Sequence, residues 1–87
     1  MKDSIKIITQ LLIVSVNYDL EIIKINFTNI NSISGEVECT FKTEDNKLTI
    51  KCLYEKNNMH DVNSVGCYIN YKLGELLKEN KNDENTY

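Results

Sequence analysis

The chain has 87 residues with 13 acidic and 10 basic side chains, and its net charge is −3. This length suits one small domain with a single core, whose stability is marginal unless a partner adds to it. All the basic residues are Lys, so the guanidinium fork that binds phosphates and bases is absent, and we expect no direct nucleic-acid binding.

The composition also indicates an origin. Asn occurs 12 times, whereas Ala, Arg and Pro are absent. Asn, Ile and Lys have AT-rich codons and the absent residues have GC-rich ones. We therefore infer an AT-rich bacterial genome, or a phage or mobile element living in one. The three cysteines cannot all pair with one another, which favours a reducing cytoplasm.

Segment 3–17 is rich in Ile and Val, which favours a strand. Its polar residues, however, fall on one stripe at helical spacing: Asp3, Lys6, Gln10 and Asn17. We expect a mostly buried helix with Asp3 as its N-cap, and a strand is the alternative. The apolar run 7–16 is too short to cross a membrane and lacks the flanks of a signal peptide, so no membrane role is expected.

Segment 21–29 alternates as a half-buried strand does. The alternation places Ile23, Ile25 and Phe27 on one face. The other face then carries the remaining side chains: Ile22, Lys24, Asn26 and Thr28. Residues 29–35 are rich in turn formers and predict a connector.

Residues 35–55 alternate on both sides of Asp45-Asn46, which predicts a β-hairpin. Closing the turn there gives three core pairs, and a four-residue loop is expected to keep them: Val37–Tyr54, Cys39–Cys52 and Phe41–Ile50. The core face comprises Val37, Cys39, Phe41, Leu48, Ile50, Cys52 and Tyr54. The other face comprises Glu36, Glu38, Thr40, Lys42, Thr49, Lys51 and the apolar Leu53. We expect Cys39 and Cys52 to be buried thiols, with a cross-strand disulfide as the alternative.

A last helix is expected from an N-cap at Asp61. Its core stripe has a spacing of 3.6 residues: Val62, Val65, Ile69, Leu73, Leu76 and Leu77. The predicted fold class is α+β, a three-stranded antiparallel sheet with the N- and C-terminal helices on one face, in the order α-β-β-β-α. Residues 1–79 form the domain, and 80–87 are expected to be a flexible polar tail.

Signs of catalysis and of metal binding are weak. Cys39, Cys52, His60 and Cys67 lack the short spacing of a zinc site, and His60 lies in a polar loop without an evident catalytic partner. We therefore predict no enzyme activity, no metal and no cofactor.

The outer face of the last helix is the candidate partner-binding site, because Tyr is enriched at protein interfaces. It comprises Cys67, Tyr68, Tyr71, Lys72 and Glu75. The alternative is that the two tyrosines border the core. In that case the open face of the sheet is the candidate surface, with Lys24, Glu38, Thr40, Thr49, Lys51 and Leu53.

The first functional hypothesis is a cytoplasmic, non-enzymatic protein-binding module. In this hypothesis it is a small phage or mobile-element inhibitor of a host defence enzyme, in the manner of anti-CRISPR proteins. The alternative is an antitoxin, immunity protein or regulatory subunit that acts as a homodimer or with a cognate toxin. The expected partner is therefore another protein or a second copy of the chain.

Overall fold

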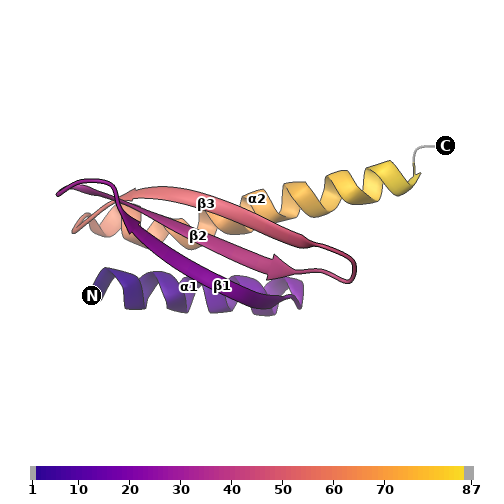
Figure 1. Cartoon of the computed structure of the whole chain (residues 1–87), viewed down its shortest axis with the longest axis horizontal. Helices are drawn as coiled ribbons and strands as arrows, with labels where there is room; N and C mark the ends of the chain where they lie inside the picture. Colours follow the sequence, from indigo (N-terminus) through magenta and orange to yellow (C-terminus); the bar gives the residue numbers. More distant parts are fainter. Residues whose placement is uncertain (1, 86–87) are drawn as a thin grey trace.

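The computed structural model describes residues 2–85, with side chains for 3–79. The chain forms α1 (Lys2–Tyr18), β1 (Glu21–Asn29), β2 (Ser34–Lys42), β3 (Lys47–Glu55) and α2 (Met59–Asn85). The strands make one antiparallel sheet in the order β1-β2-β3, and both helices cover the same face of it (Figure 1). This confirms the predicted α-β-β-β-α fold and decides for a helix at the N-terminus.

A residue with left-handed backbone conformation follows the last residue of α1 and turns the chain towards β1. Asp19 has a φ of 53°, and the next amide, of Leu20, donates to the Ser15 carbonyl at 3.0 Å. Asp tolerates this backbone region better than bulky residues do.

At the N-terminal end of α1, Asp3 is not the N-cap, because the helix begins before it. Its carboxylate instead accepts the Asn57 amide at 2.9 Å, which ties α1 to the loop before α2.

β1 contains a bulge that corrects the predicted faces. The pairing with β2 shifts between Ile22 and Lys24, so Ile23 has no direct partner and is 42% exposed. Ile22 pairs with Phe41 on the core side, as Ile25 and Phe27 pair with core residues further along. The placement of Ile23 inside and Ile22 outside was therefore wrong, because one extra residue reverses the alternation.

The hairpin register also differs from the prediction, by two residues. The strands close at the pair Lys42–Lys47, and the loop between them is held by the Thr43 hydroxyl, which accepts the Asn46 amide at 2.9 Å. Cys39 therefore lies opposite Ile50, not opposite Cys52. Both predicted faces survive, because an even shift leaves every side chain on its own side of the sheet.

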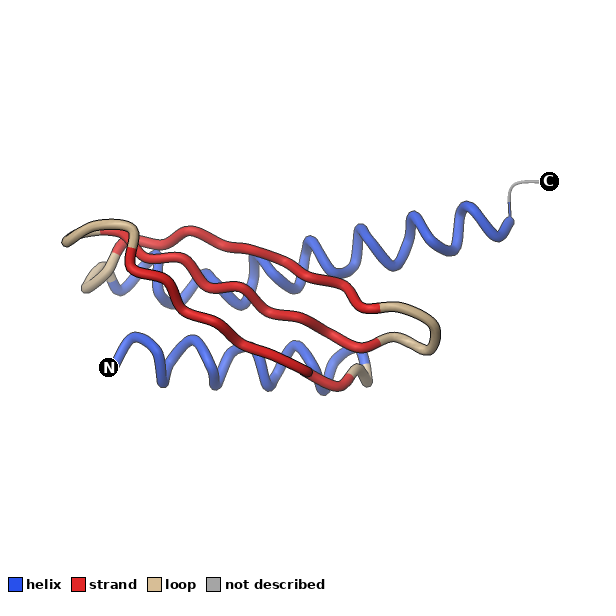
Figure 2. The backbone as a smooth tube through the Cα atoms, in the orientation of Figure 1, coloured by secondary structure: helices blue, strands red, loops and turns tan. Residues whose placement is uncertain are grey.

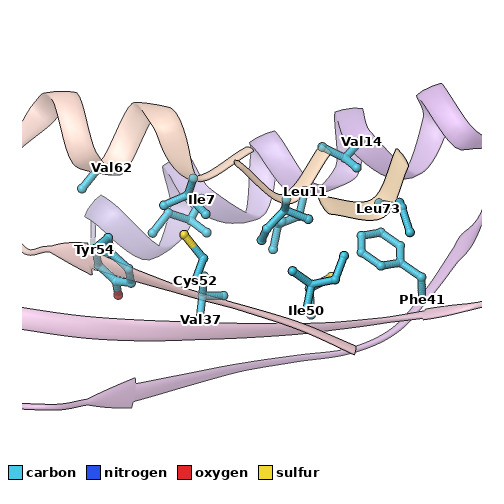
Figure 3. Close-up of a cluster of buried hydrophobic side chains, with 13 residues drawn as sticks. Ile7, Leu11, Val14, Val37, Phe41, Ile50, Cys52, Tyr54, Val62 and Leu73 are labelled. Carbon is cyan, nitrogen blue, oxygen red and sulfur yellow. The ribbon is translucent and has the colours of Figure 1, made fainter. Parts of the chain in front are cut away.

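The core lies between the sheet and the two helices (Figure 3). β2 and β3 supply its floor, and each helix contributes one apolar stripe. Its buried members are Ile7, Leu11, Val14, Val37, Cys39, Phe41, Ile50, Cys52, Tyr54, Val62, Val65, Ile69 and Leu73. The predicted core faces of the hairpin and of the last helix are thus confirmed.

α2 begins earlier than predicted. Asn58 is its N-cap, and its side-chain oxygen accepts the amides of His60 at 3.0 Å and Asp61 at 3.4 Å. Asp61 is therefore a first-turn residue, and its carboxylate accepts the Glu55 amide at 2.9 Å. Helix α2 runs past the β2–β3 turn to Asn85 (Figure 2). The flexibility predicted for 80–87 stays a prediction, and residues 86–87 lie outside the described residues.

The two helices touch at a glycine. The Gln10 carboxamide donates to the Val62 carbonyl at 2.7 Å and accepts the Gly66 amide at 2.6 Å. A β-carbon added at Gly66 would lie 2.7 Å from Cβ of Gln10. Further along, the Tyr18 hydroxyl donates to the Asn70 carbonyl at 3.1 Å. Glycine is therefore required at 66 for space, because only its backbone can approach α1 this closely.

We expect Gly66→Ala to destabilise the protein by about 1–3 kcal/mol, because the added methyl group would overlap the Gln10 side chain close to the α1 backbone. The sign of the change in unfolding free energy is informative, because replacing Gly by Ala at an exposed helix position normally stabilises a protein by about 1 kcal/mol. Urea unfolding followed by circular dichroism measures the difference.

Gly74→Ala is the matched control. Its added β-carbon would meet the Tyr18 hydroxyl oxygen at 2.7 Å, which is the tip of a side chain that can move. Its stability should therefore stay closer to that of the wild type. Equal stabilisation by both substitutions would contradict the close packing at Gly66.

Candidate protein-interaction surfaces

α2 presents one side to the core and another to solvent. Val62, Val65, Ile69 and Leu73 are buried, and residues half a turn away point outward at about 100° per residue. The five predicted site residues all lie on this helix, in three of its turns. We call Cys67, Tyr68, Tyr71, Lys72 and Glu75 the tyrosine face of α2.

Four side chains of the tyrosine face contact one another. The Tyr71 hydroxyl donates to Oε2 of Glu75 at 3.1 Å, and Lys72 Nζ lies 3.6 Å from Oε1 of the same carboxylate. Lys72 Nζ also lies 5.9 Å from the centre of the Tyr68 ring, within reach of a cation–π contact. Glu75 thus holds Tyr71 and Lys72 together on the surface.

The two tyrosines occupy different positions. Tyr71 is 62% exposed, so it does not border the core. Tyr68 is 44% exposed and lines two shallow grooves beside β3, of about 450 and 280 Å³. Lys51 of β3 lines both grooves as well. Tyr68 therefore connects the tyrosine face of α2 with the side of β3.

β3 is an edge strand of the sheet. Its outward side chains include Lys51, 3.8 Å from the Glu38 carboxylate, and Thr49, whose hydroxyl is 3.0 Å from that of Thr40. Leu53 is the apolar exception, with 68% of its surface exposed. An edge strand carries backbone groups available to another chain, which makes this side of the molecule accessible to a partner. The open face of the sheet was the alternative candidate surface, and the strand order adds that β3 forms its edge.

α1 exposes an apolar surface that was not predicted from the sequence. The expectation of a mostly buried helix is wrong for the side that faces away from the sheet. Four large apolar side chains there are between 53% and 78% exposed, and Thr9 lies among them. We call this surface the apolar ridge of α1: Ile5, Thr9, Leu12, Ile13 and Val16. The spacing 5, 9, 12, 16 is visible in the sequence and could have indicated it.

The cysteines differ in environment, and all three are free. Burial raises the pKa of the Cys39 thiol from 9.0 to about 12. Burial, and secondly the Asp61 carboxylate, raises the pKa of the Cys52 thiol. Both thiols therefore stay protonated at neutral pH. Cys67, in contrast, is exposed on α2.

Other functional groups are sparse. His60 is exposed in the first turn of α2, so its predicted position in a polar loop was wrong. Among the residues that the structure describes, no three His, Cys, Asp or Glu side chains gather closely enough to hold a metal ion. None of the helices within residues 2–85 is long and apolar enough to cross a membrane.

No protein-family model matches the chain, and no match was found among curated proteins or among solved structures.

We expect a thiol reagent at neutral pH to label Cys67 in the folded protein and to leave Cys39 and Cys52 unlabelled. The thiolate is the reactive form, and the raised pKa values of the two core thiols add to their burial. Mass spectrometry after brief labelling, with and without denaturant, shows what fraction of each cysteine has been modified.

The Cys67→Ser variant is the control and should take up no label until it is denatured. Rapid labelling of Cys39 in the native state would contradict its position beneath the helices.

Proposed function

We propose that this chain is a non-enzymatic protein-binding module that contacts its partner with the tyrosine face of α2. One observation carries the proposal. Tyr68, Tyr71, Lys72 and Glu75 form a connected, exposed cluster on a rigid helix. Tyr supplies a large contact area with a polar tip, and exposed tyrosines of this kind are frequent anchors of protein interfaces.

The contacts within the cluster favour binding. A free side chain loses about 0.5–1.5 kcal/mol of rotamer entropy when an interface immobilises it. Tyr71 and Lys72 already share the Glu75 carboxylate, so part of this ordering precedes the encounter. Lys72 and Glu75 also compensate each other in charge, and we therefore expect shape and aromatic contact, more than net charge, to select the partner.

The proposed biological setting is the cytoplasm of a bacterium, with the chain as a phage or mobile-element inhibitor of a host defence enzyme, comparable to anti-CRISPR proteins. Its support is indirect: a residue composition typical of AT-rich codons, one small domain and three free thiols. An inhibitor of this kind needs no chemistry of its own, because it blocks an enzyme by occupying its surface.

A second candidate is an antitoxin, an immunity protein or a regulatory subunit that acts as a homodimer or with a cognate toxin. The apolar ridge of α1 favours it, because permanent interfaces are more apolar than transient ones. In this case the protein should remain bound to its partner throughout purification.

We expect Tyr71→Ala to weaken partner binding by roughly 30-fold, as a hot-spot loss of about 2 kcal/mol implies. Its thermal midpoint should stay close to that of the wild type, because the ring is mostly exposed. Affinity capture identifies the partner, and titration calorimetry with the purified partner then measures the dissociation constant.

Ile33→Ala is the matched control, since Ile33 is 58% exposed but lies in the β1–β2 loop. It should bind normally. Tyr71→Ala with unchanged affinity would refute the proposed surface, and so would a variant whose affinity and stability fall together.

The setting has its own test. Bacterial strains that each carry one defence system are infected with phage while they express the chain. We expect plaque numbers to rise in one strain with the wild type and Ile33→Ala, and to stay low with Tyr71→Ala. Unchanged plaque numbers in every strain would favour the second candidate.

A further inference from the structure

The apolar ridge of α1 offers a partner almost no polar groups. Its four large side chains are Ile5, Leu12, Ile13 and Val16, of which Val16 is the most exposed at 78%. The remaining member, Thr9, donates its hydroxyl proton to the Ile5 carbonyl of its own helix at 2.9 Å. The ridge therefore offers water an apolar surface over about three helical turns, and contiguous exposed apolar patches often mark interaction sites.

The spacing of the ridge is that of a helix–helix seam. Residues 5, 9, 12 and 16 are separated by four, three and four positions, which is the alternation that keeps one stripe facing a partner helix. Ile13 and the half-buried Ile8 flank this stripe. A second helix is thus the occupant that fits the ridge.

The stripe also complements itself. When two copies of α1 run antiparallel about a two-fold axis between residues 10 and 11, Ile5 faces Val16 of the second copy. In the same register the small Thr9 faces the large Leu12. A two-fold interface requires this match of one patch with itself, and antiparallel helices also bring opposite ends of their dipoles together.

The chemistry of the ridge favours a second copy over a different protein. The five ridge residues carry no charge, so two identical surfaces can meet without repulsion. Interfaces between identical subunits are likewise more apolar and poorer in charge than transient interfaces between different proteins.

The area sets the expected strength. Fully burying one Ile, Leu or Val side chain removes on the order of 60–120 Å² from water. Because the four large ridge side chains are between 53% and 78% exposed, four from each copy bury roughly 300–600 Å². Specific interfaces begin near about 1,200 Å². The dimer should therefore be weak, and dilution should reveal its dissociation.

We propose that the chain forms a two-fold homodimer through an antiparallel pair of α1 helices, joined by the apolar ridge of each copy. The tyrosine face of α2 lies on another helix. Its residues Tyr68 and Lys72 face β3, and the flank of α2 with Gly66 and Asn70 faces α1. The proposed dimer therefore leaves the partner-binding surface uncovered.

Analytical ultracentrifugation over a range of concentrations tests the dimer. The wild type should shift from its monomer mass of 10.1 kDa to twice that mass. We expect Leu12→Lys to raise the dimer dissociation constant by more than about 100-fold, because it places two like charges in an apolar seam. Val16→Lys, at a more exposed position, repeats the test if Leu12→Lys folds poorly.

Ile33→Lys is the control, and it should dimerise as the wild type does. A wild type that stays monomeric at every concentration overturns the proposal. So does a dimer that Leu12→Lys and Val16→Lys leave intact.

Cross-linking tests the orientation, in a Cys67→Ser background that removes the exposed thiol. A mixture of the Ile5→Cys and Val16→Cys variants should form a disulfide-linked heterodimer under mild oxidation, and neither variant alone should cross-link. Cross-linking of Ile5→Cys with itself would indicate parallel helices and overturn the proposed arrangement.

Discussion

The contact between Gln10 and Gly66 determines how the rest of the molecule is arranged. The Gln10 carboxamide binds the Val62 carbonyl and the Gly66 amide, two neighbouring backbone groups at positions i and i+4 of α2, so it holds α1 against α2 at this point. In this arrangement, Ile7 and Leu11 point into the core. The opposite side of α1 is then left as the apolar ridge.

A three-stranded sheet with two helices on one face can bury only one side of each helix. α2 suits this arrangement, because its outward side carries a polar and aromatic cluster that water tolerates. α1 does not, because it is apolar on two sides, and the fold covers only one of them. The two helices therefore present surfaces of different kinds: an ordered polar and aromatic cluster on α2, and an apolar ridge on α1 that suits a second copy of the chain.

The parts of the fold that follow from hydrophobic period were predictable, and those that depend on a single hydrogen bond or an extra residue were not. Alternation identified the core face of the hairpin even though its register was wrong by two, since an even shift conserves the face. The bulge at Ile23 escaped prediction because one added residue leaves no trace in composition. The cap at Asn58 escaped it because Asp61 is an equally good capping residue three positions later.

The apolar ridge shows why a surface is harder to predict than a core. From the sequence, α1 was expected to be mostly buried, with one polar stripe at Asp3, Lys6, Gln10 and Asn17. Two members of that stripe bind protein: Asp3 accepts the Asn57 amide, and Gln10 bridges to α2. A polar side chain can satisfy a backbone group of a neighbouring helix as well as it binds water, so polarity alone does not mark the exposed side. Where a short helix has two apolar sides, the partners of its few polar residues decide which side remains outside.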